Sequence, residues 1–133
     1  MKVLVKKEKM ENNEYYLWNR FIECLLNEEF GDDLSRIQKV AKHCFWYDAE
    51  MNSGGHSGYF ECYSDENFDE IEKSLVNIGA EEYAKNFKIA IETGEKDDYI
   101  ITDDKFGELT PVLTDIIRTY VMDNINEFFI IVG

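Results

Sequence analysis

Both histidines and two of the three cysteines have side chains that could bind a metal ion or take part in nucleophilic catalysis: His43, Cys44, His56 and Cys62. A zinc site needs four such ligands that converge on one point. His43 and Cys44 are adjacent in a segment with helical periodicity, and adjacent side chains on a helix point in different directions. The sequence therefore predicts no metal site and no cofactor.

Several acidic residues are adjacent in the sequence, and carboxyl groups can act as general acid and base when they converge in space with separated pKa values. Such pairs include Asp32/Asp33, Glu81/Glu82, Asp97/Asp98 and Asp103/Asp104. Sequence neighbours do not converge in this way, and the chain has no nucleophile elbow, P-loop, dinucleotide fingerprint or HExxH motif. His56 and Cys62 could form a Cys–His pair, but no third residue that would orient them is evident. We expect no catalytic residue and a protein that is not an enzyme.

The charge balance is strongly acidic, with 28 acidic residues against 14 basic ones and a net charge of −14. Residues 1–9 carry +3, from four lysines and one glutamate, so residues 10–133 carry −17. Such a surface repels nucleic acid and anionic membranes and attracts basic protein surfaces with fast, salt-sensitive association. We therefore expect a basic protein partner and no direct binding of nucleic acid or membrane. The alternative is that the charge serves solubility alone.

The densest group of carboxylates lies between residues 61 and 82, where Lys73 is the only basic residue. It consists of Glu61, Asp65, Glu66, Asp69, Glu70, Glu72, Glu81 and Glu82. This number matches the roughly 6–10 phosphates that a DNA-binding protein contacts. Duplex DNA has one charge per ~1.7 Å, whereas carboxylates at i and i+4 of a helix recur every ~6 Å, so imitation of DNA requires two or more aligned acidic helices or a dimer. These eight residues are the candidate partner surface, with an ordinary solvated face as the alternative.

A glycine-rich stretch, residues 52–63, holds three of the eight glycines. Gly54 and Gly55 are predicted to form a tight corner, because glycine accepts a positive φ and a close approach of other backbone. Beyond it, Tyr59, Phe60 and Tyr63 share one face of a short predicted helix. The corner thus places aromatic side chains in the core, and we interpret His56 as a hydrogen-bonding residue of the corner.

Four amphipathic segments on either side of this corner predict helices. Their apolar stripes are Trp18, Phe21, Ile22 and Leu25 within residues 11–30; Leu34, Ile37, Val40, Ala41, Cys44 and Phe45; Phe68, Ile71, Leu75 and Ile78; and Tyr83, Ala84, Phe87, Ala90 and Ile91 within residues 81–93. Gly31 is predicted to end the first helix, and Asp32 or Asp33 to cap the second. Asn67, with Glu70 three residues on, predicts a capping box for the third.

Residues 94–108 carry six acidic residues and are predicted to form an acidic loop with a short extended piece at 99–102. Thr110 followed by Pro111 predicts a fifth main helix with proline at its first position. The apolar tail, residues 124–133, can end as a helix or pair as a strand with residues 2–5.

The sequence therefore predicts an all-α single domain over residues 1–133. It consists of a bundle of about five main helices, a short helix after the glycine corner, an N-terminal extension at residues 1–10 and a possible strand pair formed by the terminal segments.

No segment predicts secretion or a membrane span. The N-terminal apolar run is too short for a signal peptide, and the run at residues 128–132 is far below the roughly 18 residues that a span needs. Cys24, Cys44 and Cys62 are odd in number and widely spaced, which is typical of free thiols in a reducing compartment. We therefore expect a cytoplasmic protein.

The stretch from Glu50 to Phe60 resembles the hallmark of the DNA-mimic-protein-19-like family, which is an acidic residue, an asparagine, a Gly-Gly pair, a histidine or phenylalanine, and an aromatic pair. The matching residues are Asn52, Gly54, Gly55, His56, Tyr59 and Phe60. Ser53 is an insertion relative to the commonest spacing. Weaker similarity, for example at Ile78–Ala80 and Tyr120, extends over roughly residues 15–125.

The resemblance implies an all-helical acidic fold that can form a homodimer, and it implies that the motif determines the fold. The named member of that family presents carboxylates in the manner of duplex phosphates and occupies the DNA-binding surface of a transcription factor. Our first hypothesis is therefore an acidic protein that binds a basic DNA-binding protein. An immunity or antitoxin-like inhibitor of a basic toxin is the second, and a scaffold domain without a charge-dependent partner is the third.

Overall fold

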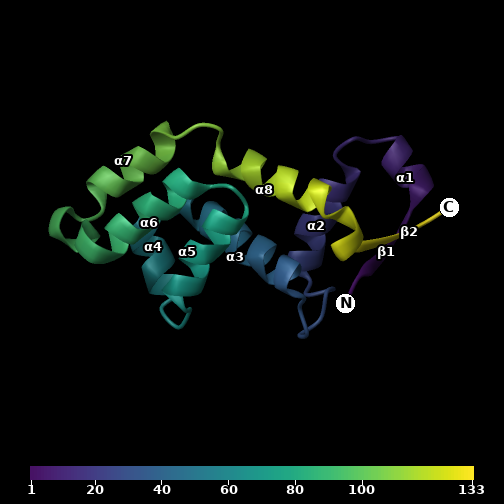
Figure 1. Ribbon diagram of the computed structural model, residues 1–133, viewed down its shortest axis with the longest axis horizontal. Helices are drawn as coiled ribbons and strands as arrows, with labels where there is room; N and C mark the ends of the chain where they lie inside the picture. The colour runs from purple at the N-terminus through teal and green to yellow at the C-terminus, as the bar shows by residue number, and fades with distance from the viewer.

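The computed structural model describes residues 1–133 and is built mainly from helices around one hydrophobic core (Figure 1). The strands are β1 (Val3–Lys6) and β2 (Phe129–Val132); the α-helices are α1 (Lys7–Glu11), α2 (Tyr16–Leu26), α3 (Arg36–Met51), α4 (Gly55–Cys62), α5 (Phe68–Asn77), α6 (Glu81–Thr93), α7 (Ile100–Glu108) and α8 (Leu113–Asp123). Two 3-10 helices, η1 (Gly94–Asp97) and η2 (Ile125–Glu127), complete the order. The predicted mostly helical fold is confirmed.

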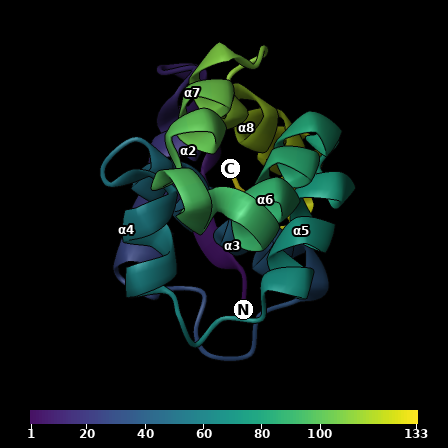
Figure 2. The ribbon, with the colours of Figure 1, turned by 90° about the vertical axis from the view of Figure 1, so that its left-hand side faces the viewer.

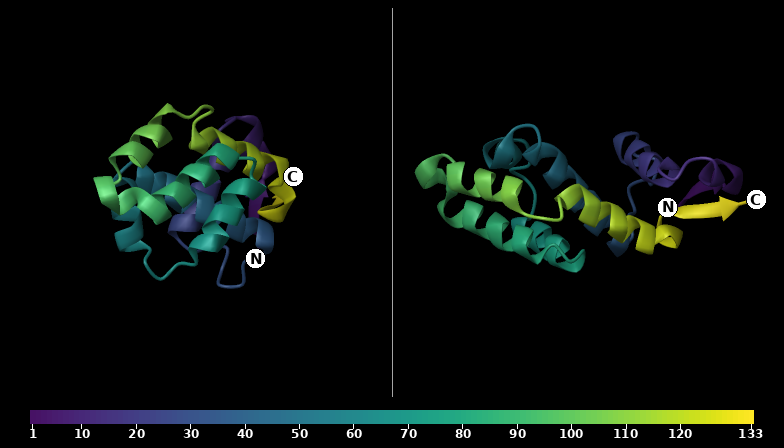
Figure 3. Two further views of the ribbon diagram at one scale, coloured as in Figure 1. Left: turned by 60° about the vertical axis from the view of Figure 1, so that its left-hand side comes forward. Right: turned by 90° about the horizontal axis from the view of Figure 1, so that it is seen from above.

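The two strands pair in parallel and bring both terminal segments to the same end of the molecule (Figure 3, right). Val3 lies opposite Phe129. The buried side-chain amide of Gln38 donates to the carbonyl oxygens of Met1 (2.9 Å) and Glu127 (3.0 Å), which holds both strands against α3. The strand pair, one of the two alternatives for the apolar tail, is thus confirmed, and the N-terminal extension consists of β1 and α1.

The longest helix, α3, runs through the centre of the molecule and contacts α4, α5 and α8 (Figure 2). Its N-terminus carries a capping box: the Ser35 hydroxyl accepts from the backbone N–H of Gln38 (3.1 Å), and the Gln38 side chain accepts from the backbone N–H of Ser35 (3.0 Å). The prediction of Asp32 or Asp33 as the cap is therefore wrong. Ser35 directly precedes the first helical residue, which is the N-cap position. A side chain at this position reaches the backbone N–H of the third helical residue, and Asp32 and Asp33 lie too early in the chain to do so.

Aromatic side chains fill the core in two groups. One surrounds Phe21 and contains Trp18, Phe30, Phe45 and Phe128; the other surrounds Phe87 and contains Tyr47, Tyr59, Phe60 and Phe68. Ring centroids lie 5.0–6.3 Å from those of Phe21 or Phe87, in offset or edge-to-face arrangements that stabilise aromatic pairs. Cys44, which lies on a predicted apolar stripe, is fully buried, and so is Cys24.

The first predicted helix, residues 11–30, is shorter in the structure: α2 begins at Tyr16 and ends at Leu26 rather than next to Gly31, and Glu11 is the last residue of α1. Glu28 adopts a left-handed conformation (φ 54°) that starts the turn. The Arg20 guanidinium then binds the Glu29 carboxylate through two hydrogen bonds of 2.6 Å, a charge-assisted fork that holds the turn against α2. A glutamate in a left-handed conformation has no sequence signal, so the early helix end could not be predicted.

Residues 94–108 contain η1 and α7, so the prediction of an acidic loop with an extended piece is wrong. Asp98 and Tyr99 both have left-handed backbones (φ 56° and 62°), which reverse the chain between the two helices. The Asp97 carboxylate accepts from the backbone N–H of Ile101 (2.9 Å) in the first turn of α7. Most polar residues of this segment lie on the outer face of a helix, and their density made the segment resemble a loop.

Helix α8 begins at Leu113, so the predicted start at Pro111 is also wrong. Val112 is extended (φ −61°, ψ 147°), and the peptide bond before Pro111 is cis. The Tyr83 hydroxyl lies within hydrogen-bond distance of the carbonyl oxygens of Leu109 (3.1 Å) and Pro111 (2.8 Å). The proline therefore belongs to the connection between α7 and α8, which Tyr83 fastens to α6.

Candidate functional site

The glycine corner connects α3 to α4 and has the predicted positive φ at Gly55 (+67°), whereas Gly54 has φ −116°. A Cβ atom on Gly55 would lie 2.5 Å from Oδ2 of Asp103 in α7. At the end of α3, the side-chain amide of Asn52 donates to the carbonyl oxygen of Asp48 (2.8 Å). The corner is thus fixed by hydrogen bonds on one side and closely approached by α7 on the other.

A hydrogen-bonded chain of three side chains crosses this corner. His56 is completely buried, and its Nε2 lies 2.7 Å from the Tyr47 hydroxyl of α3. Its Nδ1 lies 2.7 Å from Oδ1 of Asp103, which also accepts from the His56 backbone N–H (3.0 Å). Because a carboxylate can only accept, the network assigns the proton of the neutral ring to Nδ1 and makes Nε2 the acceptor of the Tyr47 hydroxyl. His56 therefore joins α3, α4 and α7.

Sequence reasoning predicted His56 as a hydrogen-bonding residue of the corner but missed both of its partners. Asp103 lay in the stretch taken for a loop, and Tyr47 was not singled out. A signal was present: Thr102 and Phe106, four residues apart, both turn inward, as on one face of a helix. Recognition of that spacing would have placed Asp103 on an ordered element.

Burial decides the protonation states in this network. It lowers the pKa of His56, against the opposing effect of Asp103, and it raises the pKa of Tyr47 well above its ordinary value. A fully buried phenol that stays protonated and cannot meet a substrate is a poor nucleophile or base. The Tyr47–His56–Asp103 chain therefore holds α3, α4 and α7 together.

The remaining motif residues support the same corner. Tyr59 is buried and stacks on Tyr63 with ring centroids 4.9 Å apart, and Phe60 packs on Phe68 at 5.1 Å. Phe60 also lies against the His56 ring, with centroids 5.8 Å apart. The predicted insertion of aromatic side chains into the core after the corner is thus observed.

The residues considered as metal ligands lie in separate surroundings. His43 contacts the Ser74 hydroxyl through Nδ1 (3.3 Å), His56 contacts Tyr47 and Asp103, Cys44 is in the core, and Cys62 is exposed. No three His, Cys, Asp or Glu side chains are grouped so that they could hold an ion.

A buried carboxyl, that of Asp48, ties α3 to α8. Oδ2 of Asp48 accepts a short hydrogen bond from the Thr114 hydroxyl, and its Oδ1 accepts from the Asn52 amide (3.2 Å). Burial raises the pKa of Asp48, while these two hydrogen bonds oppose the rise. Asn52 of the motif therefore takes part in this contact as well as in the end of α3.

Acidification is expected to destabilise the protein through its histidines. Burial lowers the pKa of His43 and of His56, so below pH ~6.5 the unfolded chain takes up protons that the folded protein does not. The stability that the neutral rings contribute is complete above that pH and is lost as the pH falls toward the folded pKa values. Urea unfolding at pH 7.5 and 5.5 measures the change, with His43→Gln as the matched variant. A pH dependence that is unaltered in this variant would contradict the assignment to His43.

The eight candidate acidic residues occupy three successive helices and their connections. Glu61 is on α4, Asp65 and Glu66 on the following turn, Asp69, Glu70 and Glu72 on α5, and Glu81 and Glu82 on α6. Six are exposed; Glu70 and Glu72 are half-buried. Of the eight, only Glu82 has a cationic partner within 4 Å, Lys85 at 3.1 Å. The set is a band across neighbouring helices rather than one helix face.

Basic residues lie beside this band in three places. Glu70 lines a hollow together with Arg36, Lys39 and His43 of α3. Glu72 and Glu81 line another together with lysines of α6. Glu66 lines a third together with Lys42 and His43 of α3. The carboxylates of the band that line none of these three hollows include Glu61, Asp65 and Asp69.

Helix α7 and η1 carry a second set of acidic residues, which the candidate surface did not include. These are Glu95, Asp97, Asp98, Asp104 and Glu108, none of which has a cationic partner within 4 Å. Asp104 and Glu108 are four residues apart and thus lie on one helix face. Because residues 94–108 were predicted to form a loop, this set was not recognised as part of an ordered surface.

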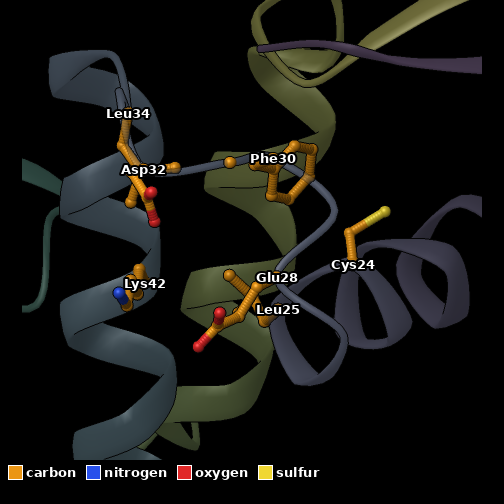
Figure 4. Close-up of a pocket in the computed structure, with 8 residues that line it drawn as sticks. Cys24, Leu25, Glu28, Phe30, Asp32, Leu34 and Lys42 are labelled. Carbon is orange, nitrogen blue, oxygen red and sulfur yellow. The ribbon is translucent and has the colours of Figure 1, made fainter.

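The cavity in Figure 4 lies between the end of α2, the following turn and α3, and has a volume of about 130 Å³. Glu28, Asp32 and Lys42 bring charge to its rim. Cys24 is its only sulfur, and burial raises the pKa of that thiol to about 12. The thiol therefore stays protonated at neutral pH and is not an activated nucleophile.

None of the helices combines the length and apolar character that crossing a membrane requires. A protein-family model described as DMP19-like protein matches residues 32–129, a range that contains the glycine corner and all eight candidate acidic residues. No curated protein and no solved structure matches the chain. The family match extends from the turn before α3 to the first residue of β2, and the chain therefore belongs to the DMP19-like protein family.

Proposed function

We propose that the protein is a non-catalytic acidic binding protein that occupies the basic surface of a DNA-binding protein by imitating the charge of duplex DNA. The observation that carries this proposal is the band of carboxylates on α4, α5 and α6, in which seven of eight have no cationic partner within 4 Å. Unpaired carboxylates on ordered helices remain available to a basic partner, because no existing ion pair has to break first.

The arrangement of helices supports imitation of DNA on grounds of spacing. A single helix offers a carboxylate every ~6 Å, which is too sparse for a duplex with one charge per ~1.7 Å. Packed helices lie 8–10 Å apart, so adjacent acidic helices multiply the charges within one surface. Helices α4, α5, α6 and α7 all gather at the end of the molecule opposite the strands (Figure 1). The resemblance described above implies the same use of carboxylates.

The proposal is tested by capture and then by competition. The protein is immobilised, incubated with a lysate of the source cell at low salt, and washed with increasing salt. We expect a basic DNA-binding protein that elutes as salt rises and that a 20-base-pair duplex displaces. Capture of a basic toxin would favour the inhibitor alternative, and capture of no basic protein at low salt would contradict the proposal.

Charge reversal on α5 is expected to weaken the partner complex. Asp69→Lys, Glu70→Lys and Glu72→Lys together should raise Kd by about tenfold or more (~1.4 kcal/mol) and reduce its salt dependence. The measurement is a titration of the captured partner at two salt concentrations.

The control is the same change of charge at the other end of the molecule. Glu11→Lys, Glu14→Lys and Asp123→Lys alter exposed residues that have no ion-pair partner. This variant should lose much less affinity. Equal losses would mean that net charge, rather than the α4–α6 band, determines binding.

A further inference from the structure

The terminal sheet has only two strands, so each strand has one side without a neighbouring strand. The Val3 backbone N–H donates to the carbonyl oxygen of Phe128 (2.9 Å). In a parallel ladder, backbone groups of alternate residues face the partner strand, and the N–H groups of Leu4 and Lys6 therefore point away from β2. We call this side of β1 the β1 edge. Unpaired strand edges are templates for the addition of a further strand.

The side chains beside the β1 edge alternate between the core and solvent. Val5 is buried, whereas Lys2, Leu4 and Lys6 share the outer face at intervals of two residues. Leu4 is 59% exposed, and its neighbour on β2, Ile130, is 50% exposed. The outer face of β1 therefore presents one exposed apolar side chain, Leu4, between the two exposed cations Lys2 and Lys6.

The charge of the N-terminal segment differs in sign from that of the rest of the chain. Residues 1–9 carry +3, while residues 10–133 carry −17. None of the four lysines in residues 1–9 has an acidic partner within 4 Å. The sheet also lies at the far end of the long axis from α4 and α7 (Figure 1), and physiological salt screens exposed charges that are separated by more than ~8 Å.

We propose that the β1 edge binds an extended, acidic segment of a partner protein, which adds to the sheet as a third strand. Directly opposite residues in adjacent strands interact, so the segment should place carboxylates beside Lys2 and Lys6 and an apolar side chain beside Leu4. This requires the pattern acidic-x-apolar-x-acidic, because strand side chains alternate with a period of two. A second copy of β1 fits poorly, since antiparallel pairing about Leu4 would set Lys2 against Lys6 of the other copy.

The test uses a blocked synthetic peptide, Thr-Glu-Thr-Val-Thr-Glu-Thr, labelled for fluorescence anisotropy and titrated against the full chain at peptide concentrations up to about 1 mM. We expect saturable binding that weakens as salt rises. Hydrogen exchange at the Leu4 amide should slow at least several-fold when peptide is bound. A peptide with lysine in place of both glutamates, and one with proline in place of valine, should not bind.

Two protein variants with the same change of charge locate the site. Lys2→Glu with Lys6→Glu should weaken peptide binding tenfold or more, whereas Lys96→Glu with Lys105→Glu, at the opposite end, should change it less than twofold. Circular dichroism verifies that both variants are folded. The proposal is overturned if the acidic peptide does not bind, if the lysine peptide binds equally well, or if binding leaves exchange at Leu4 unchanged. A dimer in sedimentation whose contact already protects the Leu4 amide would also overturn it.

Discussion

Replacement of Gly55 by valine is expected to lower the free energy of unfolding by about 3–5 kcal/mol, which is a fall in melting temperature of about 10–20 °C for a domain of this size. Gly55 has φ +67°, a conformation that β-branched residues avoid, and a Cβ there would lie 2.5 Å from Oδ2 of Asp103. The valine would therefore strain the corner and displace Asp103 from His56 at the same time. Thermal unfolding followed by circular dichroism measures the loss.

Gly79→Val is the matched control for this variant. Gly79 has a similar backbone (φ +88°), but no heavy atom lies within 4 Å of the position of its Cβ. The expected loss there is the backbone cost alone, about 1–2 kcal/mol. Normal stability of Gly55→Val, or equal losses in the two variants, would show that close packing of α7 on the corner contributes nothing.

Asp103→Ala is expected to lower the free energy of unfolding by about 2–4 kcal/mol. Oδ1 of Asp103 accepts from both the ring and the backbone N–H of His56, and His56 is fully buried. Both donors would lose their acceptor in a site where the ring has no contact with solvent. Because this carboxylate joins α7 to α4, hydrogen exchange should accelerate in α7 more than in α3. Urea unfolding and exchange measured by mass spectrometry give the two results.

Asp103→Asn separates the acceptor from the charge. The amide oxygen of asparagine can accept the same two hydrogen bonds, so the expected loss is below about 1 kcal/mol. If asparagine and alanine at this position destabilise the protein equally, the negative charge, and not the hydrogen-bond acceptor, is what the corner requires.

Local patterns predicted those parts of the fold whose cause is local. The apolar stripe around Phe21 and the N-cap at Asn67, whose side chain accepts from the backbone N–H groups of Asp69 and Glu70, follow from spacing and capping chemistry. The positive φ of Gly55 likewise follows from the residue type. The predicted reciprocal bond from Glu70 at this cap is not observed.

The parts that sequence reasoning missed depend on contacts between distant residues. Asp103 meets His56 across 47 positions, and only the folded arrangement of α4 and α7 brings the two together. Helix α7 itself was hidden because its outward acidic residues dominate its composition. For the candidate surface, the number of carboxylates in each stretch of sequence could be counted. The cations of α3 that approach Glu70 could not be predicted, because they are distant from Glu70 in the sequence.

The pairing of β1 with β2 also has a consequence for the order in which the protein folds. Val3 and Phe129 are separated by nearly the whole sequence, and closing so long a loop costs conformational entropy that only later contacts repay. During synthesis, β1 leaves the ribosome before β2 and has no strand to pair with until residues 129–132 emerge. The N-terminal segment must therefore remain unpaired while α2 to α8 assemble, and its net positive charge and lysine-flanked strand protect it from premature association with other strands.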